Sequence, residues 1–166
     1  MMTLCCEVLA ALQGKTLVTA ESLTGGGIGA AITAVSGSSA VYKGGIISYT
    51  NQVKHRILGV PAEVLEVHGA VSEPVAEAMA RGARKLLDAD IAVSVTGLAG
   101  PGGDEYGNPV GTVFIGYADE NQAVVKQCLF HGTREDIRNQ TIEAAMKLIL
   151  ERNQSACRWP AEESCE

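Results

Sequence analysis

The sequence is poor in aromatic residues and in positive charge. Only 4% of its 166 residues are Phe, Trp or Tyr, and 13 Lys and Arg stand against 19 Asp and Glu, for a net charge of −6. Broad nucleic-acid binding needs a basic face, so we expect no nucleic-acid partner. A local basic pocket for a small anion is compatible with this balance.

Long apolar runs and zinc-site spacings are also missing. No stretch of about 20 apolar residues would span a bilayer, and no cationic stretch precedes the apolar start of the chain, as it would in a signal peptide. The cysteines are Cys5, Cys6, Cys128, Cys157 and Cys165. Their number is odd and they include no CxxC pair. These absences predict a cytoplasmic protein with reduced, mostly inert thiols; a Cys157–Cys165 bridge is the alternative in an oxidising medium.

The length and the hydrophobic fraction of 46% predict one globular domain over residues 1–153, followed by a charged, frayed tail over 154–166. Apolar runs predict strands over 16–20, 44–50, 91–96, 111–118 and 123–130. Helical spacing and stop signals predict helices over 3–13, 27–37, 51–59, 61–69, 73–89 and 134–153. Strands and helices alternate early and a hairpin comes late. This order predicts a three-layer α/β/α domain with a mixed, mainly parallel sheet.

A first candidate site is the segment TAESLTGGG at residues 19–27, where a predicted strand turns into a predicted helix. Ser22 would stand at the N-terminus of that helix, where free N–H groups and the helix dipole favour a developing negative charge. The glycines would let a substrate approach the backbone closely. The alternative is a helix N-cap, in which Ser22 or Thr24 binds the first turn. The phosphate fingerprints GxxxxGK(S/T) and GxGxxG are absent here.

A second candidate is Lys54, on the predicted helix after the strand at residues 44–50. It precedes Ile57 and Leu58 by three and four residues, so it shares a helix face with them and borders the core. A lysine acts as a base only when it is neutral, so its pKa must fall from about 10.4 toward about 7–8. Burial and a nearby positive potential both lower that pKa. The alternative is a snorkelling lysine whose stem covers the apolar face.

Two further candidates lie after the third strand and on the last helix. Thr96 and Gly97 begin a glycine-rich loop that is long for a simple connection. The Thr96 hydroxyl and the backbone N–H groups that follow it would hold a phosphate or an oxyanion. Arg138 opens an apolar helical stripe, with Arg134 one turn before it, and suits an anion ligand. The alternatives are a flexible connection for the loop and an ion pair with a local carboxylate, such as Glu135, for Arg138.

Histidine chemistry is the competing hydrolase hypothesis. His55, His68 and His131 have the pattern of ordinary loop or helix residues, but spacing alone leaves open a Ser–His hydrolase that uses His68 or His131. The nucleophile pattern GxSxG is absent, which disfavours that hypothesis.

Together these segments resemble the CinA C-terminal domain family, the nicotinamide-nucleotide amidohydrolases. The resemblance is carried, in order between about residues 16 and 150, by TAESLTGG, GSSAVYKGGIISYTNQVK, LGVP, HGAVSEPVAEAMA, SVTGLAGPGG, PVGTVFIG and GTREDIR. It implies hydrolysis of the carboxamide of nicotinamide mononucleotide to nicotinate mononucleotide and ammonia, with no metal or other cofactor. We also expect the stand-alone form of the domain and a homo-oligomer, with a dimer favoured.

The resemblance also implies site residues. It places a serine–lysine pair at Ser22 and Lys54, with Tyr49 beside them as a further catalytic residue. Neutral Lys54 would take the proton of Ser22, directly or through Tyr49. An N–H group of residues 23–26 or 96–98, or the Thr96 hydroxyl, would hold the oxyanion. The predicted substrate contacts are Thr24, Gly25, Gly26, Gly45, Thr96, Gly97 and Arg138. Arg138 and the glycine loops would hold the 5′-phosphate.

One position departs from the family pattern: Leu23 stands where many members carry cysteine. The alternative to an amidohydrolase is a non-catalytic nucleotide-binding or regulatory module of the same fold. Such a module would use the same glycine loops and Arg138 and would release no ammonia.

Overall fold

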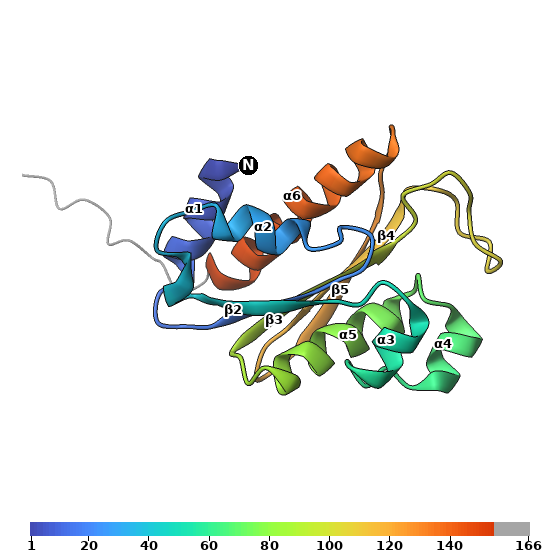
Figure 1. Ribbon diagram of the computed structural model, residues 1–166, viewed down its shortest axis with the longest axis horizontal. Helices are drawn as coiled ribbons and strands as arrows, with labels where there is room; N and C mark the ends of the chain where they lie inside the picture. The colour runs from blue at the N-terminus through green and yellow to red at the C-terminus, as the bar shows by residue number, and fades with distance from the viewer. Residues whose placement is uncertain (155–166) are drawn as a thin grey trace, which may run out of the picture.

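The computed structural model describes residues 1–154, which form a five-stranded mixed sheet in the order β2-β1-β3-β4-β5 (Figure 1). The strands are β1 (Leu17–Glu21), β2 (Tyr42–Ile47), β3 (Ile91–Gly97), β4 (Thr112–Ala118) and β5 (Ala123–Leu129). β1 pairs in parallel with both β2 and β3, whereas the β3–β4 and β4–β5 pairs are antiparallel. Four of these five strands therefore run in one direction, and β4 is reversed.

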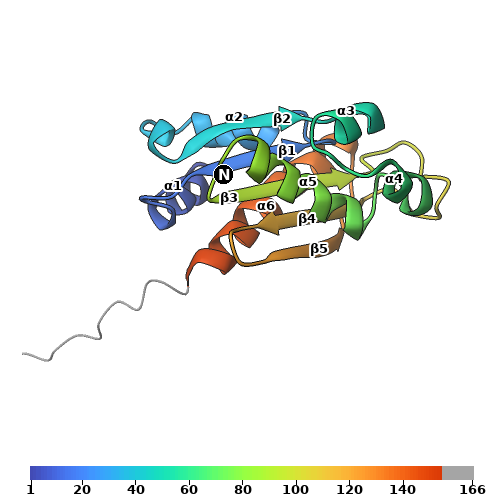
Figure 2. The same cartoon turned by 90° about the horizontal axis from the view of Figure 1, so that it is seen from below.

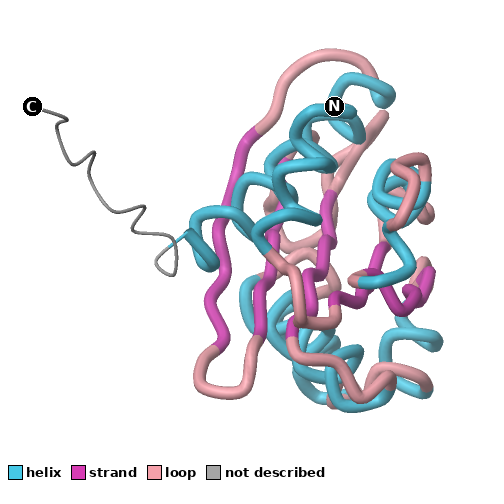
Figure 3. The backbone as a smooth tube through the Cα atoms, turned by 90° about the vertical axis from the view of Figure 1, so that its left-hand side faces the viewer, coloured by secondary structure: helices cyan, strands magenta, loops and turns pink. Residues whose placement is uncertain are grey.

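Helices cover both faces of the sheet, which forms the middle layer (Figures 1 and 3). One face carries α1 (Met2–Ala11), α2 (Gly27–Thr33) and α6 (Arg134–Asn153), and the other carries α3 (Asn51–Arg56), α4 (Ala62–His68) and α5 (Glu73–Leu86). A short 3-10 helix, Ser38–Ala40, leads into β2. The predicted three-layer α/β domain is confirmed. Within residues 1–154, no helix is both long enough and apolar enough to cross a bilayer.

An apolar core lies on each face of the sheet. Val93 and Ile149 belong to the core beneath α1, α2 and α6, and Ala92 and Met79 belong to the core beneath α5. The first six residues of β3 are all buried, as predicted for a strand that is covered on both faces. Neighbouring side chains of one central strand therefore serve two different cores.

Two predicted placements near the site were wrong. α2 begins at Gly27 as predicted, but this is five residues after Ser22, so Ser22 does not stand at the helix N-terminus. The reason is local: Gly25 and Gly26 adopt φ values of 59° and 97°, which interrupt a right-handed helix. β2 ends at Ile47, so Tyr49 lies in the loop beyond the strand. Of the predicted tail, residues 155–166 lie outside the described residues, with Cys157 and Cys165 among them.

The carboxyl ends of β1, β2 and β3 meet at one edge of the sheet, where the long loop between β3 and β4 also lies (Figure 2). Ligands of open α/β sheets bind outside this edge, because the loops that follow parallel strands converge there.

Candidate active site

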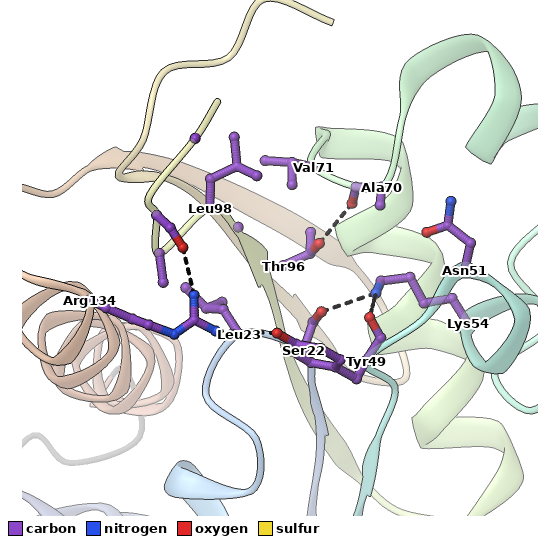
Figure 4. A pocket seen from close by; sticks show the side chains of 14 residues that line it. Ser22, Leu23, Tyr49, Asn51, Lys54, Ala70, Val71, Thr96, Leu98 and Arg134 are labelled. Atoms are coloured by element: carbon purple, nitrogen blue, oxygen red, sulfur yellow. Dashed lines mark hydrogen bonds between the residues drawn. The ribbon is translucent and has the colours of Figure 1, made fainter. Parts of the chain in front are cut away.

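A cavity of about 340 Å³ opens at this edge of the sheet (Figure 4). Small-molecule sites span roughly 300–1,000 Å³, so it can hold a compact ligand. The predicted site residues that line it are Ser22, Tyr49, Lys54, Thr96 and Gly97. They come from the ends of β1 and β3, the loop after β2, and α3. The structure thus brings together segments that lie far apart in the sequence.

Ser22 and Lys54 are in direct contact inside this cavity. Lys54 Nζ lies 3.0 Å from Ser22 Oγ, and both residues are buried, with 1% of Lys54 and 7% of Ser22 exposed. The Ser22 backbone continues the β1–β3 pairing, since its N–H donates to the Val95 carbonyl. Thr50 caps α3 through its hydroxyl, which accepts the Val53 N–H. Sheet pairing and helix capping therefore set the position of each partner.

Two backbone carbonyls hold the Lys54 amine. Nζ donates to the Ser48 oxygen at 2.7 Å and to the Tyr49 oxygen at 3.5 Å. Because a carbonyl oxygen only accepts, Lys54 must supply both hydrogens. A neutral amine has two hydrogens and one lone pair, so its lone pair is left for Ser22 Oγ. This arrangement suits a lysine that removes the serine proton.

The surroundings of Lys54 increase the fraction of that neutral form. Burial lowers the pKa of Lys54 from its usual 10.5 to about 8. Among the described residues, no carboxylate lies within ion-pair distance of Nζ, so nothing of that kind holds the proton on the amine. A pKa near working pH is what a general base requires.

Glu21, the residue before the serine, is a buried carboxylate that the sequence analysis did not single out. It accepts hydrogen bonds from the hydroxyl of Thr24 and from the N–H groups of Gly26, Ile28 and Gly29. Glu21 therefore binds the first turn of α2, a role that the sequence assigned to Ser22 or Thr24. The signal was weak, because this carboxylate reaches as far as eight residues along the chain and matches no standard capping spacing.

The same contacts narrow the choice of oxyanion donor. The Gly26 N–H is occupied by Glu21, and the Gly25 N–H donates to the Ser22 carbonyl. Among residues 1–154, no acceptor takes the N–H of Leu23 or of Thr24. Leu23 also lines the cavity. The two residues directly after the serine thus keep the free N–H groups of this turn.

The two arginines of the last helix have different positions. Arg134 lines the cavity and donates to the Gly100 carbonyl at 2.7 Å and to the Tyr49 hydroxyl at 3.2 Å. Arg138 does not line the cavity: its Nε donates to the Leu23 carbonyl at 3.0 Å, and a terminal nitrogen donates to the Thr24 carbonyl at 3.1 Å. The cavity arginine is therefore Arg134, while Arg138 supports the turn that follows Ser22.

The remaining predicted substrate contacts also lie outside this cavity. They are Thr24, Gly25, Gly26 and Gly45. Thr24 is fully buried and its hydroxyl donates to Glu21. Gly26 and Gly45 line a separate groove of about 210 Å³ beside Tyr42. A Cβ at Gly45 would approach the Thr19 hydroxyl and the Tyr42 hydroxyl too closely, so packing within the fold accounts for this glycine.

The histidines do not line this cavity, and no group of metal ligands is found in the described residues. His55, His68 and His131 are not among its lining residues, and His55 Nδ1 lies 2.7 Å from the Val60 carbonyl. The geometry therefore offers Ser22 an amine and not an imidazole. Over the described part of the chain, no three His, Cys, Asp or Glu side chains are grouped to hold a metal ion.

Comparison with known proteins identifies the family. The CinA C-terminal domain family matches residues 3–153. This chain belongs to that family. The CinA-like protein of Mycolicibacterium gilvum is 46% identical over 144 residues, which is 86% of this chain and 34% of that protein. The CinA-like protein of Parasynechococcus marenigrum is 60% identical over 110 residues, 65% of this chain and 26% of that protein. The chain thus spans about a third or less of these relatives.

Solved CinA structures share the fold. A competence-damaged protein (CinA) superfamily protein from Klebsiella pneumoniae superposes with a TM-score of 0.90 at 36% identity, covering 93% of this chain and 98% of that one. The competence/damage inducible protein CihA from Agrobacterium tumefaciens gives a TM-score of 0.89 at 38% identity, covering 92% and 95%. The family resemblance and the fold are therefore both confirmed.

Proposed function

We propose that this protein hydrolyses the carboxamide of nicotinamide mononucleotide, giving nicotinate mononucleotide and ammonia. The observation that carries the proposal is the buried 3.0 Å contact between Lys54 Nζ and Ser22 Oγ. A serine hydroxyl is a weak nucleophile until an adjacent base accepts its proton. The choice of substrate comes from the resemblance to the amidohydrolase family, since names such as "CinA-like protein" state no reaction.

The acylation step uses the amine twice. Neutral Lys54 accepts the proton of Ser22 as Oγ forms a bond to the carboxamide carbon, and the carbonyl π electrons move onto the oxygen. The lysine then returns the proton to the amide nitrogen, the C–N bond breaks, and ammonia leaves. An ester of Ser22 with the pyridine carboxyl group remains.

The deacylation step repeats this chemistry with water. Lys54 removes a proton from a water molecule as its oxygen attacks the ester carbon. The proton returns to Ser22 Oγ as the ester bond breaks, and nicotinate mononucleotide departs. The pyridinium charge of the substrate assists both steps, because it withdraws electrons from the carbonyl and disfavours the protonated lysine.

The N–H group of Leu23 is the donor we assign to the oxyanion, because Leu23 lines the cavity and directly follows Ser22. Among residues 1–154, no other acceptor takes this N–H. One such donor contributes about 3 kcal/mol to the transition state. Arg138 assists indirectly. It donates to the carbonyls of Leu23 and Thr24 and so fixes the turn that carries the Leu23 N–H.

Arg134 and Tyr49 provide the subsite for the 5′-phosphate in this proposal. A guanidinium has five N–H donors, and the two contacts of Arg134 leave others for an anion. The Tyr49 hydroxyl accepts from Arg134, so its own hydrogen is available to a phosphate oxygen. The Tyr49 side chain is 59% exposed, which places this subsite at the mouth of the cavity. The Tyr49 contact with Lys54 is made by its backbone oxygen.

The test is a direct assay of ammonia released from nicotinamide mononucleotide. The wild-type protein should release one ammonia for each nicotinate mononucleotide formed. Ser22→Ala should release none while its circular dichroism spectrum is unchanged. A fully active Ser22→Ala protein would contradict the mechanism. Calorimetric binding of the mononucleotide by the wild-type protein, with no ammonia released, would favour the non-catalytic nucleotide-binding module.

A further inference from the structure

We infer that Thr96 makes this site selective for a carboxamide over a carboxylate, because its hydroxyl presents only hydrogen-bond acceptors to the ligand. The inference rests on the proposed function and adds a specificity-determining residue to it. It concerns the reacting end of the cavity, beside Ser22.

Thr96 lies next to the nucleophile. Glu21 pairs with Val95 in the parallel β1–β3 register. Ser22 and Thr96 are the next residues along these two neighbouring strands, so they lie side by side. Neighbouring strands are about 4.8 Å apart. Both residues line the cavity (Figure 4), and a carboxamide whose carbon is in contact with Ser22 Oγ therefore comes close to the Thr96 hydroxyl.

The only hydrogen of this hydroxyl is already used. Thr96 Oγ1 donates to the Ala70 carbonyl oxygen at 2.7 Å. A carbonyl oxygen cannot donate, so the direction of this hydrogen bond is unambiguous. Thr96 is 1% exposed, which leaves bulk water little access to compete for the hydrogen. The Thr96 hydroxyl is accordingly not the oxyanion donor, one of the alternatives that the sequence left open.

The acceptor of that bond is held firmly in place. The carbonyls of Gly69, Ala70 and Val71 each receive a side-chain hydrogen bond, from Ser72 at 2.8 Å, from Thr96, and from Asn108 at 3.2 Å, respectively. The segment between α4 and α5 is thus fixed at three successive peptides. The Ala70 oxygen therefore cannot easily turn away and free the Thr96 hydrogen.

What Thr96 offers the ligand is a lone pair. A hydroxyl oxygen can accept two hydrogen bonds, and among residues 1–154 no group donates to Thr96 Oγ1. The NH₂ of a carboxamide supplies such a hydrogen. A carboxylate supplies none at neutral pH, so its oxygen would face the lone pairs of Thr96 without a proton between them. The site therefore binds the amide and disfavours the acid that the reaction forms.

Binding to an inactive protein tests the inference directly. In the Ser22→Ala background at pH 9, where the Lys54 amine is mostly neutral, calorimetry should give an affinity for nicotinamide mononucleotide at least about tenfold above that for nicotinate mononucleotide. Adding Thr96→Val or Thr96→Ala should reduce this preference to less than about twofold, whereas Thr96→Ser, which keeps the hydroxyl, should retain it. The alanine variant serves if valine prevents folding.

The outcomes separate the inference from the proposed function. Equal affinities for amide and acid in the Ser22→Ala protein, or a tenfold preference that survives Thr96→Val or Thr96→Ala, would overturn the inference and leave the proposed function standing. Binding of neither mononucleotide by Ser22→Ala, together with no ammonia release by the wild-type protein, would overturn both.

A kinetic ratio provides a readout that a purely structural role of Thr96 would not change. The methyl ester of nicotinate mononucleotide has no N–H to offer Thr96. Thr96→Val should therefore lower the ratio of kcat/KM for the amide to kcat/KM for the ester about tenfold, and Thr96→Ser should restore it. The ratio is independent of the fraction of folded protein. An equal loss on both substrates would contradict the inference.

Discussion

Lys54 Nζ lies between Ser22 Oγ at 3.0 Å and the Ser48 carbonyl oxygen at 2.7 Å. β1 and β2 are neighbouring parallel strands, and β2 is the outermost strand of the sheet. The amine connects the end of β1 with the loop after β2. It is buried without a carboxylate partner among the described residues. Its protonation state therefore affects both the proposed reaction and the stability of the fold.

The first prediction concerns the pH dependence of activity. Since only the neutral amine accepts a proton and the pKa of Lys54 is about 8, kcat/KM should rise with pH up to about 8 and then level off. Lys54→Met should lower kcat at least about 100-fold. Lys43→Met, a change of an exposed lysine that hydrogen-bonds the Asp88 carbonyl, is the matched control and should keep full activity. A flat profile between pH 6.5 and 9 would count against Lys54 as the base.

The second prediction concerns stability. The unfolded lysine has a pKa of 10.5 and the folded one about 8. Between these values the unfolded state binds a proton that the folded state does not, so folding becomes more favourable as pH rises. The wild-type protein should gain up to about 1.4 kcal/mol per pH unit over this window relative to Lys54→Met. Urea unfolding at pH 7, 8, 9 and 10 measures the difference; parallel curves for the two proteins would refute it.

The third prediction concerns the Glu21 carboxylate. The Glu21 carboxylate accepts four hydrogen bonds through its two oxygens. Glu21→Gln replaces one of these oxygens with an NH₂ group, which cannot accept, so at least one buried N–H or hydroxyl loses its acceptor. The free energy of unfolding should fall by about 1–3 kcal/mol. The control is Glu77→Gln, which removes an exposed ion pair with Arg81 and should change stability by less than about 0.5 kcal/mol. Similar effects of both substitutions would show that the Glu21 contacts contribute little.

The fourth prediction separates the two arginines. Arg134→Ala should raise KM for nicotinamide mononucleotide about tenfold or more and have little effect with nicotinamide riboside, which lacks the phosphate. Arg138→Ala should lower kcat for both substrates and also lower the melting temperature, because the carbonyls of Leu23 and Thr24 lose their donors. Initial-rate kinetics with the two substrates make the comparison. A selective loss of phosphate binding in Arg138→Ala would reverse these roles.

The fold could be predicted from local patterns because those patterns reflect burial. The near-continuous apolar run at residues 91–96 predicted a central strand, and β3 is buried between two helical layers. The predicted hairpin over the last two strands is confirmed by the antiparallel β4–β5 pairing. Ser22 was wrongly expected at the N-terminus of α2, because Gly25 and Gly26 form a turn between them that helical spacing does not reveal.

The site was predictable only in part. Lys54 was identified as a residue at the border of the core, and its position against Ser22 was implied by the family resemblance. Arg134 and Arg138 lie four residues apart on one helix and share a face, so spacing could not decide which one reaches the cavity. That choice depends on how α6 crosses the sheet, since only Arg134 extends beyond its edge to Gly100.

The amino-acid sequence by itself determined the order of helices and strands, the buried character of the central strands, and the family, because these depend on local periodicity and on motifs read along the chain. Only the tertiary structure decided that the Lys54 amine contacts Ser22, that Glu21 holds the start of α2, and that Thr96 donates its hydrogen to Ala70. Those properties depend on distances between segments that only packing brings together, and a hydrogen bond is short and directional.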